Sequence, residues 1–323
     1  MLDKYNRQIN YLRLSVTDRC NFRCVYCLPS QGTAWRDHSE ILTYEEMLKL
    51  IKIFNKAGIT KIRLTGGEPL LRKGLVEFVA SIKALGVIAD ISLTTNGSLL
   101  APLAEALKIA GLNRVNISLD TINPVSFNKI TTCGCLADTL AGIESALKAG
   151  LTPVKLNVVL TDALTERDLD YFTKLINSYP ISVRFIEYMP INNKAVPRGM
   201  DIAMVKKLLG IKGRKMFKPS TVIQGNGPAK YYHSPKAQGS FGFITPISEH
   251  FCGTCNRMRL TADGRLKPCL LSNTEIDIKT PLRNGASDRA LTEIFHNAIR
   301  DKLEGHLNCW DSGYPWNMSQ VGG

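Results

Sequence analysis

Apolar and polar positions alternate along six short stretches between residues 11 and 187, and longer stretches between them repeat apolar residues at helical spacing. Thr43 and Glu46 form a capping-box pattern at the start of the first helical stretch. Six successive βα units predict an α/β fold with a parallel sheet, either open or curled into a partial TIM-like (βα)6 barrel. The expected strands are 11–16, 61–65, 89–94, 114–119, 154–160 and 182–186, and glycines that suit helix C-terminal ends are Gly58, Gly86, Gly111 and Gly150.

One face of the predicted strands is unusually polar. Strands of parallel sheets are usually apolar on both faces, and polar groups in a dry core need partners. We therefore expect a barrel lumen that holds a polar ligand, with a solvent-facing sheet surface as the alternative. With a period of two residues, the polar face consists of Arg13, Ser15, Arg63, Thr65, Ser92, Thr94, Asn116, Ser118, Asp120, Lys155, Asn157 and Arg184.

Unusual loops follow the predicted strands. Working residues of (βα) barrels lie at the C-terminal ends of the strands, so we expect these loops to meet at one rim. They are the cysteine loop after the first strand, residues 65–69 after the second, 94–97 after the third, 118–120 at the fourth and 187–190 after the sixth.

Three cysteines follow the first strand, with three and then two residues between them: Cys20, Cys24 and Cys27. A structural zinc needs four protein ligands, whereas a four-iron cluster held by three thiolates keeps one iron open for a substrate or cofactor. The alternatives are a zinc site completed by a distant residue such as His38, or plain reduced cysteines. Tyr26, directly before the last cysteine, favours the iron–sulfur interpretation.

A second cysteine group lies near the C-terminus, at Cys252, Cys255 and Cys269. Residues 190–245, rich in Pro, Gly, Lys and Asn, predict a linker with one helix near 200–209. Asp263 and Gly264 predict a hairpin between the last two cysteines. A zinc ribbon that uses His250 as its fourth ligand is the alternative to a second cluster.

Composition narrows the class of protein. A chain of 323 residues suits one large α/β domain with a smaller appendage. No apolar run approaches the roughly 20 residues of a membrane span, and no signal peptide is recognisable, so we expect a cytoplasmic protein without a membrane partner. Nine cysteines then indicate metal or redox chemistry rather than disulfides.

The net charge of +13 is compatible with nucleic acid or with a polyanionic small molecule. An aromatic content of 7% and the lack of a Lys/Arg-rich run or recognition helix argue against nucleic acid. If the basic side chains converge on one cavity, a polyanionic small molecule is the favoured ligand.

Together these motifs resemble the GTP 3′,8-cyclase family of radical S-adenosylmethionine (SAM) enzymes, over nearly the whole chain. The first cysteine triad and Gly66-Gly67-Glu68-Pro69 are shared by many radical SAM enzymes, whereas the second triad with its Asn-Arg-x-Arg segment points to this family. The family tends to have glycine in place of Thr132. The remaining matching motifs are Thr94-Thr95-Asn96-Gly97, Arg184-Phe185-Ile186-Glu187, Asn256-Arg257-Met258-Arg259 and Gly322-Gly323, while Cys133 and Cys135 match no family ligand and Cys309 has no assigned role.

The resemblance implies a radical SAM partial barrel over 1–190 and a C-terminal region over 191–323 with a second cluster and a Gly-Gly tail. It implies two 4Fe-4S clusters, one on each cysteine triad. SAM contacts are implied at Tyr26, Gly67, Ser118 and Met189. GTP contacts are implied at Arg13, Arg63, Thr94, Lys155, Arg184, Arg257, Met258 and Arg259, and catalytic roles at Arg13, Arg257, Arg259, Gly322 and Gly323.

The implied activity is a lyase reaction, the first step of molybdenum cofactor biosynthesis. A 5′-deoxyadenosyl radical abstracts the ribose 3′ hydrogen of GTP, and the carbon radical attacks C8 to give (8S)-3′,8-cyclo-7,8-dihydroguanosine 5′-triphosphate. The sequence identifies neither the electron donor nor the oligomeric state, for which a homodimer is one alternative. Two other functions stay open: a peptide-modifying radical SAM maturase, whose members usually carry more C-terminal cysteines, and a zinc-bearing basic protein that binds nucleic acid.

Overall fold

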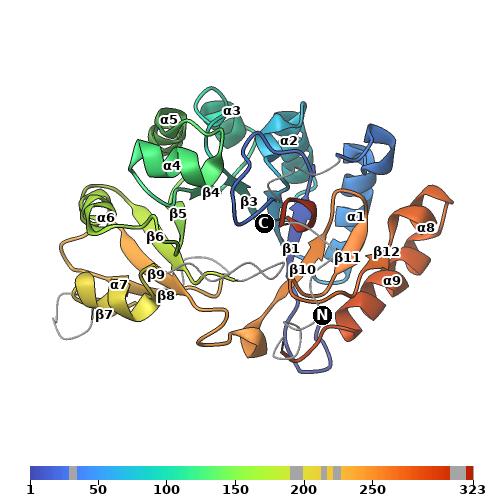
Figure 1. The fold of residues 1–323 in the computed structure, drawn as a ribbon. Coiled ribbons are helices and arrows are strands. Elements are labelled where there is room, and N and C mark those ends of the chain that lie inside the picture. Colours follow the sequence, from blue (N-terminus) through green and yellow to red (C-terminus); the bar gives the residue numbers. More distant parts are fainter. Residues whose placement is uncertain (29–34, 190–198, 212–216, 221–226, 306–317, 323) are drawn as a thin grey trace. The chain divides into compact units, whose positions relative to one another are not determined.

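The structure is a computed structural model that describes residues 1–28, 35–189, 199–211, 217–220, 227–305 and 318–322 (Figure 1). The chain folds into two compact units, each with its own set of strands and helices. The first unit comprises Met1–Thr94, Ala106–Asn113 and Cys252–Gly323, and the second comprises Thr95–Glu105 and Arg114–Phe251.

The sheet of the first unit has the strand order β12-β11-β10-β1-β2-β3. Strand β1 lies in its interior and pairs in parallel with both β2 and β10, and β2 pairs in parallel with β3. The two remaining pairings, of β10 with β11 and of β11 with β12, are antiparallel. The strands are β1 (Tyr11–Ser15), β2 (Lys61–Thr65), β3 (Asp90–Thr95), β10 (Arg257–Leu260), β11 (Arg265–Lys267) and β12 (Ile276–Asp277).

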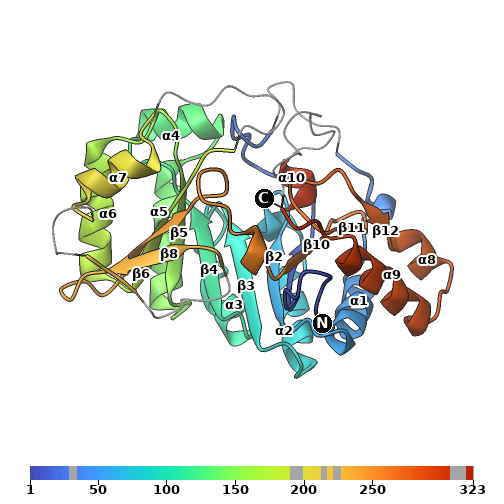
Figure 2. The same cartoon turned by 90° about the horizontal axis from the view of Figure 1, so that it is seen from below.

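Helices cover the apolar side of this sheet, where Leu12, Leu14 and Ile62 are fully buried. The predicted capping box opens α1: the Thr43 hydroxyl accepts from Glu46 N at 3.2 Å, and the Glu46 carboxylate accepts from Thr43 N at 2.8 Å. Figure 2 shows α8 and α9 beside β11 and β12. The helices are α1 (Tyr44–Lys56), α2 (Leu75–Ala84), α8 (Lys279–Arg283), α9 (Asp288–Arg300) and α10 (Met318–Val321), with short 3₁₀ turns η1 (His38–Glu40), η2 (Pro69–Leu71) and η4 (Cys252–Thr254), while α3 (Ala104–Ile109) spans the boundary of the two units.

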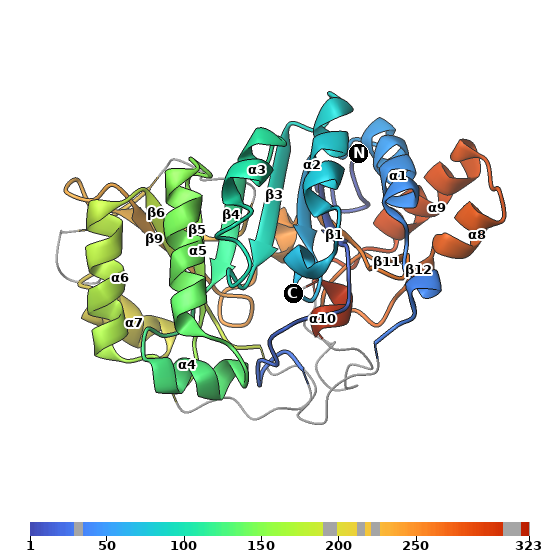
Figure 3. The ribbon, with the colours of Figure 1, turned by 90° about the horizontal axis from the view of Figure 1, so that it is seen from above.

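The sheet of the second unit has the strand order β4-β5-β6-β9-β8-β7. Strands β4, β5, β6 and β9 are parallel, and β7 and β8 pair antiparallel at the edge. Figure 3 shows α5 and α6 running alongside β5 and β6. The elements are β4 (Arg114–Ser118), β5 (Val154–Val159), β6 (Ile181–Ile186), β7 (Lys218–Pro219), β8 (Lys230–His233), β9 (Ser240–Ile244), α4 (Pro124–Thr131), α5 (Leu136–Lys148), α6 (Glu166–Ser178) and α7 (Ile202–Leu208).

The six predicted strands and the predicted helix near 200–209 are confirmed, and each strand boundary differs by one residue at most. The hairpin between Cys255 and Cys269 is confirmed as β10 and β11, with Gly264 at φ +79° in the turn. The sequence did not predict that β10 would join β1 in parallel, or that β9 would join β6. No helix in the described ranges is long and apolar enough to cross a membrane.

Most residues of the polar face are buried and none is exposed, so the alternative of a solvent-facing sheet surface is wrong. Arg63 is 8% exposed, Lys155 2% and Arg184 3%, while Asn116 and Ser92 are fully buried. Ionised groups at such depth need anions or hydrogen-bond partners. The division into 1–190 and 191–323 follows the family regions rather than packing, and it stays a prediction.

Candidate active site

The first cysteine loop begins where the ends of β1 and β2 are bound together. Gly67 N donates to Thr17 O at 2.8 Å, and Glu68 N donates to Arg19 O at 2.8 Å. A Cβ on Gly67 would overlap the Arg19 carbonyl, and one on Gly66 would lie 2.5 Å from the Thr17 carbonyl oxygen. Only glycine lets the two backbones come this close, so Gly66 and Gly67 hold the segment from Thr17 to Arg19 that leads from β1 to Cys20.

The loop then folds into a compact turn. Cys27 N and Leu28 N both donate to Cys24 O, at 2.9 and 3.0 Å, and Phe22 N donates to Cys20 Sγ at 3.4 Å. Phe22 and Leu28 are buried and anchor the turn, whereas the three cysteines are half-buried. An amide that donates to a sulfur favours its thiolate form, which is the form that binds metal. Tyr26, a predicted SAM contact, is half-buried in the same turn.

The second triad is held by two cations from distant parts of the chain. Arg7 Nη1 donates to Cys252 O at 2.9 Å and is itself fixed by Asp3, whose carboxylate lies 2.6 Å from Arg7 Nε. Lys302, 2% exposed, donates Nζ to Arg257 O at 3.0 Å and to Pro268 O at 2.5 Å, directly before Cys269. Neither cation was predicted from the sequence, because neither lies in a motif and only the fold brings them to the cysteines.

Cys255 has a perturbed acidity. Burial raises the pKa of its thiol, but the nearby cations Arg257 and Lys302 lower that pKa to about 6. The same pairing raises the pKa of Arg257 although burial lowers it. The two cations therefore favour the thiolate form of Cys255, which is the form that binds iron.

Three arginines form one row across the sheet of the first unit. Arg13 is in register with Arg259 of β10 on one side and with Arg63 of β2 on the other, and Arg63 is in register with Ser92. Neighbouring strands are about 4.8 Å apart and cross-strand partners share a face, so the guanidinium groups are close together. Burial, then Arg259 and Arg63, holds the pKa of Arg13 well below its ordinary value. Burial, then Arg257, lowers the pKa of Arg259 to about 10.

Some buried polar atoms in and beside this row have no hydrogen-bond partner within the described ranges. Nε of Arg63 and Oγ1 of Thr94 are among them. An unsatisfied buried donor costs about 1–3 kcal/mol, so both atoms and the clustered charge favour a bound anion with several acceptor oxygens.

The C-terminal tail reaches this row. Arg259 Nη1 donates to Val321 O at 3.0 Å and to Gly322 O at 2.7 Å. Gly322 has φ +75°, and a Cβ there would lie 2.7 Å from Thr65 Cγ2 and 3.5 Å from Ser15 Cβ. The tail is thus seated on the ends of β1 and β2. Gly323 lies outside the described residues, as do Pro190 and Cys309.

The second unit carries the other predicted contacts on neighbouring strands. Arg184 Nη2 donates to Asn116 Oδ1 at 2.7 Å and to Asn157 Oδ1 at 2.5 Å, which fixes the guanidinium above the sheet. Lys155 Nζ lies 5.7 Å from the centre of the Tyr231 ring. Ser118 ends β4 in register with Asn157, and half-buried Met189 follows β6. The two asparagines belong to the predicted polar face but were not predicted as site residues.

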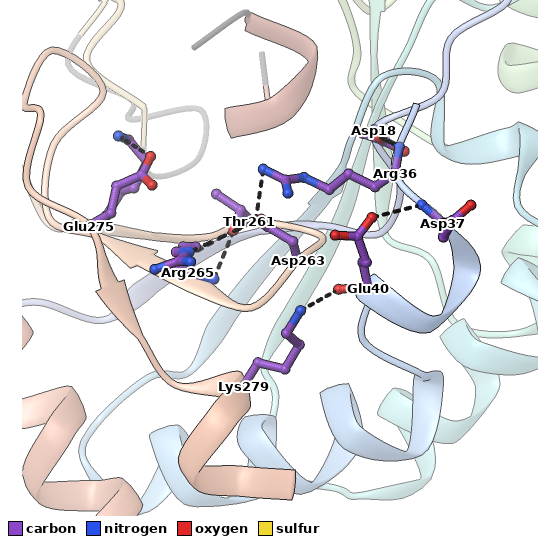
Figure 4. A network of polar contacts seen from close by, with 10 residues as sticks. Asp18, Arg36, Asp37, Glu40, Thr261, Asp263, Arg265, Glu275 and Lys279 are labelled. Atoms are coloured by element: carbon purple, nitrogen blue, oxygen red, sulfur yellow. Dashed lines mark hydrogen bonds and ion pairs between the residues drawn. The ribbon is translucent and has the colours of Figure 1, made fainter. Parts of the chain in front are cut away.

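A polar network ties the segment after the first cysteine loop to the hairpin that carries Arg257 and Arg259 (Figure 4). Arg36 N donates to Asp18 Oδ2 at 2.9 Å, and the Arg36 guanidinium pairs with Asp263 Oδ2 at 3.0 Å. Thr261 Oγ1 donates to Asp263 Oδ1 at 2.6 Å and so holds that carboxylate. The β10–β11 hairpin, which lies between Cys255 and Cys269, is therefore joined through Arg36 to the segment just before the first cysteine loop.

Known proteins match the chain in sequence and in fold. A model of the radical SAM superfamily matches residues 14–176, and a model described as Molybdenum Cofactor Synthesis C matches residues 181–308. The chain is 48% identical to the GTP 3′,8-cyclase of Heliobacterium modesticaldum and 49% identical to that of Desulforamulus reducens, in both cases over 100% of both chains. The chain belongs to the GTP 3′,8-cyclase family.

Membership in the GTP 3′,8-cyclase family confirms the predicted enzyme class, its place in molybdenum cofactor biosynthesis and its radical SAM cofactors. The structure also resembles Streptococcus suis SuiB bound to S-adenosylmethionine, with a TM-score of 0.63 at 14% identity, over 92% of this chain and 69% of that chain. At that identity the likeness shows a common fold, and it confirms the predicted α/β class of the radical SAM proteins.

The residues present fit the iron–sulfur clusters of this family. Within the described ranges, no three His, Cys, Asp or Glu side chains are grouped to hold a single metal ion. A four-iron cluster instead needs its thiolates spread over different irons, and it needs them deprotonated. The amide donor at Cys20 and the lowered pKa of Cys255 favour deprotonation at one cysteine of each triad.

The departure from the family pattern at Thr132 has a structural counterpart. Thr132 follows α4 with φ +67°, a conformation that glycine adopts at lower cost. Cys133 and Cys135, directly after it, are exposed.

Proposed function

We propose that this chain converts GTP to (8S)-3′,8-cyclo-7,8-dihydroguanosine 5′-triphosphate. The observation that carries the proposal is the in-register row of Arg259, Arg13 and Arg63, flanked by the orphaned atoms Arg63 Nε and Thr94 Oγ1. Cys20, Cys24 and Cys27 would hold the cluster that binds SAM, and SAM would supply the 5′-deoxyadenosyl radical chemistry that removes the ribose 3′ hydrogen of GTP.

The cation row binds the triphosphate in this proposal. A triphosphate carries about four negative charges, and guanidinium groups bind phosphate oxygens bidentately. The three clustered arginines repel one another until an anion neutralises them, and this repulsion adds to the effect of burial in lowering the pKa of Arg13. The row is therefore arranged for a polyanion before the substrate arrives. In the second unit, Lys155 and the fixed guanidinium of Arg184 supply further cations for GTP.

The remaining predicted residues hold the cofactors and the tail. Cys20, Cys24 and Cys27 hold one cluster, and the later triad holds the other. We assign SAM contacts to Tyr26 and to the backbone of Gly67 in the first unit. The other assignments are Ser118 and Met189 for SAM, Cys252, Cys255 and Cys269 for the second cluster, and Arg257 and Met258 for GTP.

Arg259 has two tasks in the proposal, because the guanidinium that faces the phosphates also holds the tail through Val321 and Gly322. The tail thereby excludes water from the reacting sugar and fixes the position of its C3′. We further propose a cytoplasmic enzyme that receives its electron from an external donor and binds no nucleic acid, in keeping with the composition and the biosynthetic role of its relatives.

The test uses protein purified without oxygen and incubated with GTP, SAM and a chemical reductant. We expect roughly eight irons per chain and the cyclised nucleotide as product. Replacing the first triad by alanine halves the iron and abolishes SAM cleavage, whereas replacing the second triad halves the iron and abolishes only the cyclisation. An iron-loaded protein that cleaves SAM but never alters GTP contradicts the proposal.

A further inference from the structure

The phenol of Tyr11 is a buried polar group that the proposed function does not use. Tyr11 is 1% exposed, and its hydroxyl has no hydrogen-bond partner within the described ranges. Burying a hydroxyl without a partner costs about 1–3 kcal/mol, so most native hydroxyls at this depth have one. The observation points to a partner that is not part of the chain.

The position of Tyr11 in the sheet indicates the chemical class of that partner. Tyr11 and Arg13 are two residues apart on β1 and therefore lie on the same face. Tyr11 is in register with Arg257 on β10 and with Lys61 on β2. The Arg63 guanidinium lies over its ring, 5.4 Å from the centre. The phenol is therefore surrounded by the groups that attract an anion.

We propose that Tyr11 is a substrate-binding residue whose phenolic O–H donates to a phosphoryl oxygen of the nucleoside triphosphate. The inference rests on the proposed function, because it takes the cation row to be the triphosphate site. Nothing in the sequence pattern pointed to Tyr11, since an aromatic residue at the start of a strand is ordinary core.

A neutral donor suits this place better than a further cation. The arginines of the row already lower the pKa of Arg13 through their mutual repulsion and burial, and another charge would add to that repulsion. A phenol contributes a hydrogen bond to an anion without added charge. Its ring also supports the Arg63 guanidinium by a cation–π contact, which orients the fork toward the same ligand.

The chain contains a matched control in Tyr44. Its hydroxyl is also buried without a partner in the described ranges, and an arginine, Arg72, lies 4.1 Å from its ring centre. Tyr44 begins helix α1 and stacks on Phe78 of α2, away from the polar face of the strands. Loss of its hydroxyl therefore measures the effect of removing a buried, unpartnered phenolic oxygen elsewhere in the same unit.

The experiment compares wild type, Tyr11→Phe and Tyr44→Phe as iron-loaded holoenzymes. Anaerobic equilibrium dialysis measures the Kd of GTP, and displacement of GTP measures the affinity of inorganic tripolyphosphate. Because a hydrogen bond to a charged acceptor is lost, we expect Tyr11→Phe to weaken both ligands by the same factor of about 10 or more. Tyr44→Phe leaves both affinities unchanged, and both variants keep the wild-type iron content and melt no lower than wild type, since each loses an unsatisfied buried hydroxyl.

Three results overturn the inference. Unchanged affinities in Tyr11→Phe show that the phenol does not contact the substrate. A loss for GTP with unchanged tripolyphosphate shows that it contacts the nucleoside instead. An altered electron paramagnetic resonance spectrum of the second cluster without a change in GTP affinity assigns the phenol to the cluster. If wild type itself fails to bind GTP, the proposed function fails, and that result is distinct from these three.

Discussion

Gly322 gives the sharpest test of the proposed role of the tail. Its φ of +75° is in the left-handed region, and a Cβ would lie 2.7 Å from Thr65 Cγ2. In Gly322→Ala, the backbone conformation costs about 1–2 kcal/mol. The steric overlap with the Thr65 methyl adds about 1 kcal/mol, the low end for overpacking, because a terminal residue can shift. The total of about 2–3 kcal/mol corresponds to a roughly 30- to 150-fold smaller equilibrium constant for docking of the tail.

The assay follows two products of one reaction mixture, 5′-deoxyadenosine and the cyclised nucleotide. We expect Gly322→Ala to lower the rate of cyclisation by up to that factor while the iron content and SAM cleavage stay near wild type. The overlap can be removed separately, because Thr65→Ser deletes the methyl carbon that the new Cβ meets. The double variant should therefore regain about fivefold in cyclisation, the part of the loss that is steric.

Thr65→Ser alone is the control, and it should change cyclisation little. Wild-type cyclisation by Gly322→Ala would refute the reasoning, since the tail would then not need its docked conformation. A loss that Thr65→Ser does not relieve would show that the contact with β2 is not the cause.

Three further replacements test the framework of the site. Arg259→Ala should weaken GTP binding about 10- to 150-fold with SAM cleavage largely retained, and equal loss of SAM and GTP binding would indicate a folding defect instead. Lys302→Met keeps the buried stem but leaves two backbone carbonyls without their donor, so we expect about 3 kcal/mol lower stability in a thermal melt and loss of the second cluster's iron, and full iron content would contradict that role. Arg184→Lys keeps the charge but loses the fixed guanidinium, and GTP affinity should fall about tenfold, unless the charge alone suffices.

Much of the secondary structure could be predicted from the sequence, because local sequence patterns determine it. The period-two pattern located all six barrel strands, and an Asp-Gly pair located the β10–β11 hairpin. The pairing of β10 with β1 could not be predicted, because the two strands are far apart in sequence and tertiary packing, not a local sequence pattern, brings them together. That pairing is what places Arg259 beside Arg13.

In the candidate site, too, some residues could be predicted from local patterns and others only from the folded structure. The cysteine triads and the cations on the strands were recognisable from spacing and from the resemblance. Arg7 and Lys302 were not, since their hydrogen bonds to the backbone of the second triad depend on folding of both chain ends around it. Tyr11 was hidden for another reason: its ring has the character of a core residue, and only the missing partner of its hydroxyl distinguishes it.

The central claim is that this chain removes the ribose 3′ hydrogen of GTP and joins C3′ to C8. The most direct measurement uses GTP that carries deuterium at C3′, incubated anaerobically with the iron-loaded protein, SAM and reductant. We predict one deuterium in the 5′-deoxyadenosine, together with an equal amount of cyclised triphosphate that has lost it. Deuterium-free 5′-deoxyadenosine with unchanged GTP would contradict the claim.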